Sequence, residues 1–172
     1  MFKIIGAMLL IGTSTFVGFV MAERLKERSR ILRLLIRLLN ILKTEIGFHS
    51  GLLAEVFQRA SQVIHDPQMA ASLGRIAGNI GFGSDFNIGE LWDDFITSPE
   101  MGALKKEDIA VLKELGTYFG STDRMDQVER IEAARHRLEI NLETAELDSA
   151  KQVKLYRYYG FAVGATVVCL LL

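Results

Sequence analysis

The chain has 172 residues, with 20 basic and 21 acidic side chains and a formal net charge of −1. Its length suits one domain of ordinary size, its 2 prolines and high apolar content exclude a disordered or collagen-like chain, and its single cysteine excludes an intrachain disulfide framework. The near-neutral charge gives no general attraction to nucleic acid, so none is expected as a partner. Mean hydropathy is nevertheless positive at +0.22, because the apolar residues are gathered in blocks.

The first block, residues 4–22, contains no charged side chain. As a helix it would be about 28 Å long, close to the hydrocarbon thickness of about 30 Å. A cleaved signal peptide is the alternative, since residues 20–22 resemble a cleavage site. Seven basic residues follow between Arg24 and Lys43, and such a run resists translocation. We therefore predict an N-terminal transmembrane helix within residues 1–22.

The last 15 residues, 158–172, are also uncharged. They would span roughly 22 Å, which is short for a bilayer. Lys154 and Arg157 could extend their charged ends to the interface, and three tyrosines stand at the entry of the block. This pattern predicts a short C-terminal transmembrane helix. Glycines 160 and 164 have the spacing of close helix contacts, which leaves homo-oligomerisation open.

Both basic flanks lie on the side of the middle segment, residues 23–157. The positive-inside rule therefore predicts a cytosolic middle segment with both termini on the opposite side of the membrane. Of the 21 acidic residues, 16 lie from Asp85 to Asp148. Basic residues would therefore lie near the lipid and acidic residues further away. Anionic phospholipid headgroups partly explain this distribution, because they attract basic side chains.

The middle segment shows helical periods throughout. The first helix is expected to continue to about residue 48, with a polar stripe opposite an apolar one. The polar stripe comprises Arg30, Arg33, Arg37, Asn40 and Thr44. The apolar stripe comprises Leu32, Leu35, Leu39, Leu42 and Ile46.

Local capping signals mark the later helices. Ser50 is a suitable N-cap for a second helix, Asp66 followed by Pro67 opens a third, Asn87 opens a fourth and Gly120 ends a fifth. The remaining helices are expected at 52–65, 67–80 and 87–96, then one that starts between Leu104 and Ile109, which could pack on each other there, and ends at Gly120, and a last one from 123 into the second span. We predict an all-α fold, a six-helix bundle between an N-terminal and a short C-terminal transmembrane helix.

No motif in the chain combines residues that would carry catalysis. The histidines lie outside HExxH, the glycines do not form GxxxxGK[ST], and Asp93 and Asp94 point about 100° apart on a helix. One helical face carries Glu132, His136, Glu139 and Glu143. We interpret it as a solvated charged face, with metal binding as the weaker alternative. No catalytic residue, cofactor or metal is expected, and the chain is not predicted to be an enzyme.

Several segments resemble the stage III sporulation protein AB family of endospore-forming bacteria. Residues 104–127, LKKEDIAVLKELGTYFGSTDRMDQ, are similar to its Leu-Thr-Lys-Glu-Asp helix start and its Leu-Gly-x-Ser-Asp-Arg stretch. Residues 39–60, Trp92 and the ending KLYRYYGFAVGATVVCLLL also follow the family in order. Lys105 replaces the usual threonine and Thr122 the usual serine. The resemblance extends over essentially the whole chain.

The resemblance implies a function. Members belong to a secretion-like channel that joins mother cell and forespore during engulfment, in the mother-cell membrane facing the forespore. The cytosolic part is similar to the helical domain of platform protein F of type II secretion and type IV pilus systems. By that analogy it would couple a companion secretion-type ATPase, stage III sporulation protein AA, to the other channel proteins and the lipid. A pore-lining subunit of the same channel and a signal-anchored helical interaction protein are the alternatives.

Two short charged stretches are the predicted partner-binding residues. They are Lys105, Lys106, Glu107 and Asp108 at one helix start, and Ser121, Thr122, Asp123 and Arg124 at the next. Capping and turn formation are the simpler explanation for these residue types. Asp123 and Arg124 exceed what a cap requires, which favours a contact with a partner.

Overall fold

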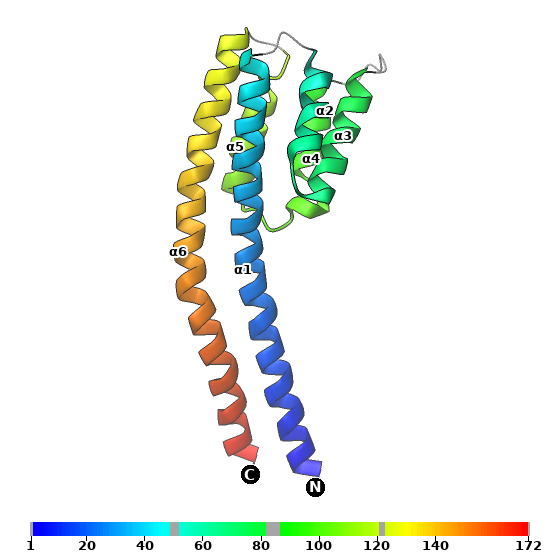
Figure 1. The fold of residues 1–172 in the computed structure, drawn as a ribbon. Helices are drawn as coiled ribbons and strands as arrows, with labels where there is room; N and C mark the ends of the chain where they lie inside the picture. The colour runs from blue at the N-terminus through cyan, green and yellow to red at the C-terminus, as the bar shows by residue number, and fades with distance from the viewer. Residues whose placement is uncertain (1, 49–51, 82–86, 121–122, 172) are drawn as a thin grey trace. The chain divides into compact units, whose positions relative to one another are not determined.

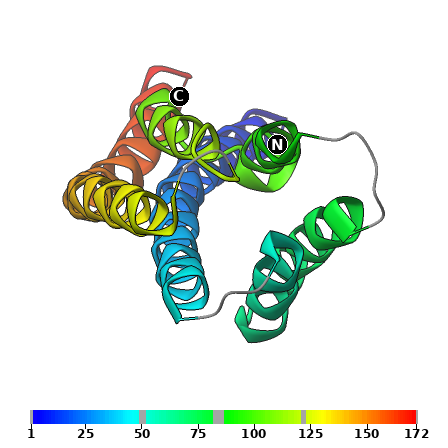
Figure 2. The same ribbon diagram turned by 90° about the horizontal axis from the view of Figure 1, so that it is seen from above.

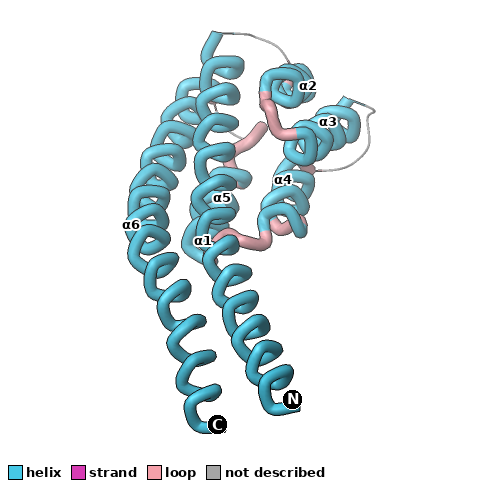
Figure 3. Tube along the Cα trace, turned by 60° about the horizontal axis from the view of Figure 1, so that its bottom comes forward, coloured by secondary structure: helices cyan, strands magenta, loops and turns pink. Residues whose placement is uncertain are grey.

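The computed structural model describes residues 2–48, 52–81, 87–120 and 123–171, and these ranges are helical with short connections (Figures 1 and 3). The elements are α1 (Phe2–Phe48), α2 (Leu53–Val63), α3 (Pro67–Gly81), α4 (Ile88–Ile96), the 3₁₀ turn η1 (Pro99–Met101), α5 (Lys106–Gly116) and α6 (Arg124–Leu171). No strand occurs within these ranges. The prediction of an all-α fold with six helices is confirmed.

Two compact units divide the chain. One joins Met1–Ser29 to Glu143–Leu172, and the other is Arg30–Leu142, called the bundle below. Among the described residues, no helix combines the length and the apolar character that a membrane crossing needs. The expected spans, 1–22 and 158–172, lie almost wholly where side chains are outside the description. The two transmembrane helices and the domain boundaries at 22/23 and 157/158 stay predictions.

The part of α1 that belongs to the bundle lies between α6 and the α2–α3 pair (Figure 2). Lys43 is 2.9 Å from Glu132 of α6, and Arg59 of α2 is 3.0 Å from Glu45. This central position explains why the apolar stripe of α1 is buried and the polar stripe exposed, as predicted. The buried apolar residues of this segment are Ile31, Leu32, Leu35, Leu38, Leu39, Leu42 and Ile46.

Two helix starts follow their predicted caps. Asp66 Oδ1 accepts a hydrogen bond of 3.0 Å from the backbone N–H of Met69, and Pro67 opens α3. Asn87 Oδ1 accepts one of 3.0 Å from the N–H of Gly89 at the start of α4. Each bond satisfies a backbone donor that the first turn of a helix leaves open. The cap expected at Ser50 lies outside the described residues.

Two expected helix bounds are wrong. α2 ends at Val63 rather than at residue 65, because Ile64 is extended (φ −74°, ψ 127°) and buried. α5 begins at Lys106, within the stretch 105–108 where we expected a helix start, but it ends at Gly116, whereas we expected Gly120 to end it. The chain continues from Gly116 in tight turns to Gly120, whose φ of +76° is the left-handed conformation that glycine adopts without strain.

Candidate interaction surface

The start of α5 is held by a buried carboxylate. Asp108 is completely buried, and its Oδ2 accepts a 2.9 Å hydrogen bond from the backbone N–H of Lys105. Its Oδ1 accepts a second bond, 2.8 Å long, from the side-chain amide of Asn141 on α6. One carboxylate therefore caps α5 and ties it to α6. Asp108 itself is enclosed by the bundle and offers no surface to a partner.

The other three predicted residues of this stretch are exposed. Lys105, Lys106 and Glu107 all face solvent, and Lys105 Nζ lies 4.0 Å from Glu107. An exposed pair of this kind is weak, and water screens it. These side chains are therefore accessible on a backbone that Asp108 holds in place.

The second predicted stretch lies at the other end of α5. Ser121 and Thr122 lie outside the described residues, Asp123 is exposed and Arg124 is half-buried. The 11 residues of α5 span roughly 16 Å, so the two stretches do not form one site. Partner binding at either stretch stays a prediction.

An aromatic cluster seats α5 against α4. Trp92 is completely buried, and its ring centroid lies 5.1 Å from that of Phe119 and 6.2 Å from that of Phe57. Its Nε1–H donates a 2.7 Å hydrogen bond to the backbone carbonyl of Leu112 on α5. A Cβ on Gly116 would lie 2.5 Å from Trp92 Cδ1, so only glycine fits there. The aromatic cluster thus packs against the second half of α5.

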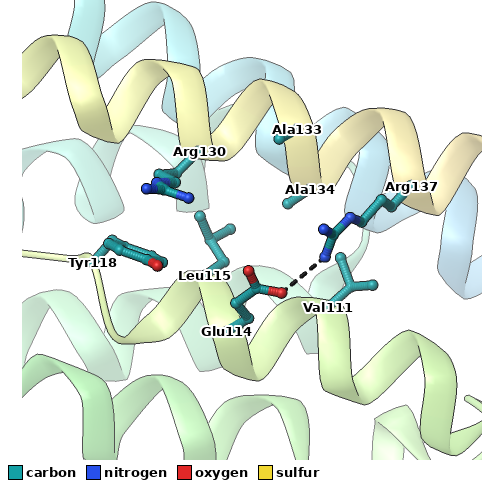
Figure 4. A pocket seen from close by; sticks show the side chains of 8 residues that line it. All are labelled: Val111, Glu114, Leu115, Tyr118, Arg130, Ala133, Ala134 and Arg137. Atoms are coloured by element: carbon teal, nitrogen blue, oxygen red, sulfur yellow. Dashed lines mark hydrogen bonds and ion pairs between the residues drawn. The ribbon is translucent and has the colours of Figure 1, made fainter.

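A narrow groove separates α5 from α6 (Figure 4). Arg137 reaches from α6 to Glu114 at 2.8 Å, and the guanidinium of Arg130 stacks 4.5 Å from the centre of the Tyr118 ring. Its lining is Val111, Glu114, Leu115, Tyr118, Arg130, Ala133, Ala134 and Arg137. Its volume of about 50 Å³ leaves room for one or two water molecules. The groove is a helix–helix seam rather than a pocket for an organic ligand.

The charged face of α6 is engaged in ion pairs. Glu132 binds Arg135 at 2.5 Å and Lys43 of α1 at 2.9 Å, and Arg135 also pairs with Glu139. The hydrogen bonds from Arg135 and then Lys43 lower the pKa of the Glu132 carboxyl to about 2. Within the described ranges, no three His, Cys, Asp or Glu side chains converge as a metal site would require. Two of the four candidate ligands on this face are thus bound by arginine.

Several of these contacts have no signal in the sequence. Asn141 lies 33 residues from Asp108, and Glu132 lies 89 residues from Lys43. Neither spacing matches a helical period or a motif. Sequence reasoning therefore missed the residues that join α5 and α1 to α6.

The sequence profile of stage III sporulation protein AB matches residues 3–172. The chain belongs to the stage III sporulation protein AB family. Stage III sporulation protein AB of Bacillus subtilis (strain 168) is 28% identical over 179 aligned residues, which cover 100% of both chains. A solved structure of stage III sporulation protein AB superimposes with a TM-score of 0.61 at 26% identity, over 72% of this chain and 96% of that one.

Membership of the stage III sporulation protein AB family confirms the resemblance seen in the sequence motifs and assigns the chain a role in sporulation. The similarity extends over the whole length of the Bacillus subtilis relative, so it includes the bundle and both terminal blocks. In this family member, α5 is the helix whose start combines a buried cap with exposed charges. That combination makes the start of α5 the best-supported candidate for a contact.

Proposed function

We propose that this stage III sporulation AB protein is a non-catalytic platform of the secretion-like channel between mother cell and forespore. In this role it docks the companion secretion-type ATPase, stage III sporulation protein AA, to the other channel proteins. The observation that carries the proposal is the rigid start of α5, where buried Asp108 fixes a backbone that presents Lys105, Lys106 and Glu107. A prearranged surface loses little conformational entropy on binding, as a docking platform requires.

The same proposal places the protein in the mother-cell membrane facing the forespore. The uncharged stretches at residues 4–22 and 158–172 would anchor it, with both termini on the far side. The seven basic residues between Arg24 and Lys43 would lie beside the anionic lipid headgroups of the cytosolic leaflet. Residues 30–142 would then stand in the cytosol, on the side where an ATPase has access to ATP.

Binding of the full-length chain to the purified companion ATPase tests the platform role. The wild-type protein, solubilised in a mild detergent, is expected to capture the ATPase. The double substitution Lys105→Glu and Lys106→Glu should weaken capture about tenfold, because it reverses both exposed positive charges. Lys113→Glu is the matched control, since Lys113 is exposed on the same helix about two turns later.

The outcomes separate cleanly. The control should bind as the wild type does, and all three proteins should unfold at similar temperatures. Failure of the wild-type chain to capture the ATPase would remove the platform role. Equal weakening by Lys113→Glu would instead show that the ATPase responds to the charge of the protein as a whole and does not bind specifically at the start of α5.

A further inference from the structure

Three large apolar side chains are exposed at one end of the bundle. Phe48 ends α1, Leu52 directly precedes α2 and Met125 lies in the first turn of α6, and these three helix ends are drawn uppermost in Figure 1. Their exposed fractions are 83%, 75% and 72%, the highest among the large apolar residues that the structure describes. These three residues are called the tip below.

Contacts between α1 and α6 hold the tip residues near one another. A Cβ added to Gly47, the neighbour of Phe48, would lie 3.8 Å from Val128, which is one turn along α6 from Met125. Only three residues separate Phe48 from Leu52, so their Cα atoms are at most about 14 Å apart. The tip is therefore one local surface.

The fold of the bundle does not explain this exposure. Burial of large apolar side chains is the main favourable contribution to folding, and the bundle forgoes it at three positions of one end. Elsewhere on the bundle the exposed large apolar residues, Val63 and Ile140, stand singly and are less exposed, at 47% and 52%. Single residues of this kind are normal on a protein surface, whereas a group of them marks an interaction site.

The charge around the tip is acidic. Residues 44–59 and 123–130 hold the tip and its nearest helical turns, and they carry five acidic and three basic side chains. Two of the three basic groups are engaged within the protein, since Arg59 pairs with Glu45 at 3.0 Å and the guanidinium of Arg130 stacks on an aromatic ring. The positive charge at this end is therefore largely directed towards the protein itself.

The negative charge beside Met125 is open to solvent. Asp126 and Glu129 are both exposed, and neither forms an ion pair with another described residue. An acidic side chain in the first turn stabilises a helix, which accounts for Asp126. Glu129 lies beyond that turn, on the same helix face as Met125. A partner would thus meet apolar side chains with unpaired carboxylates next to them.

This combination excludes two occupants. A second copy of the chain would bring one acidic surface against another, and like charges repel. Anionic lipid would be repelled in the same way. In addition, Phe48 lies about 27 Å along α1 from Arg30, where the bundle joins the unit that contains the two chain ends. A basic and apolar protein segment is the occupant that matches both properties.

We propose that the tip binds a segment of a partner protein in which large apolar side chains alternate with lysine or arginine. The apolar side chains cover the tip, and the cationic groups lie beside Asp126 and Glu129. The proposal goes beyond the platform role and does not depend on it. At the start of α5, Asp108 contacts Asn141, which is about 24 Å along α6 from Met125.

Binding of labelled peptides to the full-length protein in a neutral maltoside detergent tests this proposal. The probe is a 14-residue amphipathic peptide of leucine and lysine. One control peptide has glutamate in place of each lysine, and the other has serine in place of each leucine. Fluorescence anisotropy, corrected for detergent alone, should show saturable binding of the leucine–lysine peptide. Both controls should bind about tenfold more weakly or not at all, because each lacks one of the two properties.

Exposed apolar residues supply a matched pair of variants. The double substitution Phe48→Gln and Met125→Gln should weaken binding of the leucine–lysine peptide about tenfold. Ile140→Gln should leave it unchanged, since Ile140 is exposed on the same helix about 22 Å from Met125. Both variants should unfold at the wild-type temperature, because they change only exposed side chains.

A charge variant separates the two contributions. Asp126→Asn with Glu129→Gln should weaken binding about threefold at low salt, and the difference should shrink as salt is added.

Several results would overturn the proposal. They are equal binding of the leucine–glutamate peptide, equal weakening by Ile140→Gln, and no saturable binding of any peptide. Self-association of the wild-type chain that the Phe48→Gln and Met125→Gln substitutions abolish would assign the tip to a second copy and also overturn it. Capture of the companion ATPase is tested at Lys105 and Lys106, so either proposal can fail without the other.

Discussion

α5 and α3 both carry glycines, but the surroundings of those glycines are opposite. Gly116 at the end of α5 packs so closely on Trp92 that an added Cβ would lie 2.5 Å from the indole ring. Gly74 and Gly78 in α3 have no atom within 4 Å of the place where a Cβ would stand. Glycine lowers helix stability by about 1 kcal/mol relative to alanine at each interior position. The contact with Trp92 explains why position 116 is a glycine, whereas no contact explains the two glycines inside α3.

The difference shows which helices of the bundle depend on contacts with buried residues. α5 is held by a buried cap, a hydrogen bond from Trp92 to its backbone and a glycine contact, so each change there disturbs the core. The start of α3 also has a side-chain cap, Asp66, which in addition forms an ion pair with Arg30 that is partly open to solvent. Substitutions in the two helices should therefore differ in sign as well as in size.

The largest effect is expected for Asp108→Ala. It removes the cap of α5 and the bond to Asn141, and should lower the free energy of unfolding by about 3 kcal/mol. Urea denaturation followed by fluorescence of Trp92, the single tryptophan, measures it directly. Exposed Glu107→Ala is the control and should change stability by less than about 0.5 kcal/mol. A similar small change for Asp108→Ala would mean that water replaces the buried carboxylate.

Gly116→Ala should lower the free energy of unfolding by about 2 kcal/mol, because the new methyl group displaces the Trp92 ring. The same denaturation experiment detects the loss, and the emission maximum of the native protein should shift as the indole moves. If emission and stability both stayed unaltered, position 116 would have room for a methyl group beside Trp92, as the glycines of α3 do.

The smallest change, and one of opposite sign, is expected for Gly78→Ala. The methyl group enters open space and reduces the freedom of the unfolded chain, so stability should rise by about 1 kcal/mol. Gly74→Ala serves as the parallel variant in the same helix. A loss of stability in both variants would show that α3 packs more tightly than the bundle geometry indicates, and the contrast with α5 would fail.

The sequence alone predicted the helices best where their signals are local. Asp66 with Pro67 and Asn87 were recognised as helix starts, because a capping side chain bonds to a backbone group only two or three residues away. The buried and exposed stripes of α1 were likewise predicted, because residues three and four apart share a helix face. The start of α5 was also predicted, but its end was wrong, because the chain passes from Gly116 through tight turns before it reaches Gly120.

The partner-binding residues were only partly interpretable from sequence. The charged stretch 105–108 was identified, but its members have different surroundings: Asp108 is enclosed, whereas Lys105, Lys106 and Glu107 are exposed. No local pattern separates a buried aspartate from an exposed glutamate beside it. The separation depends on Asn141, which approaches from another helix.

The amino-acid sequence by itself thus determined the family, the all-α class and most helix bounds, since periodicity, caps and ordered motifs are short-range or linear properties of a chain. Only the tertiary structure decided which charges are buried and which glycine is required. Those properties depend on atoms that are distant in sequence and adjacent in space, and their pairing is settled by the packing of α1, α4, α5 and α6 in the bundle.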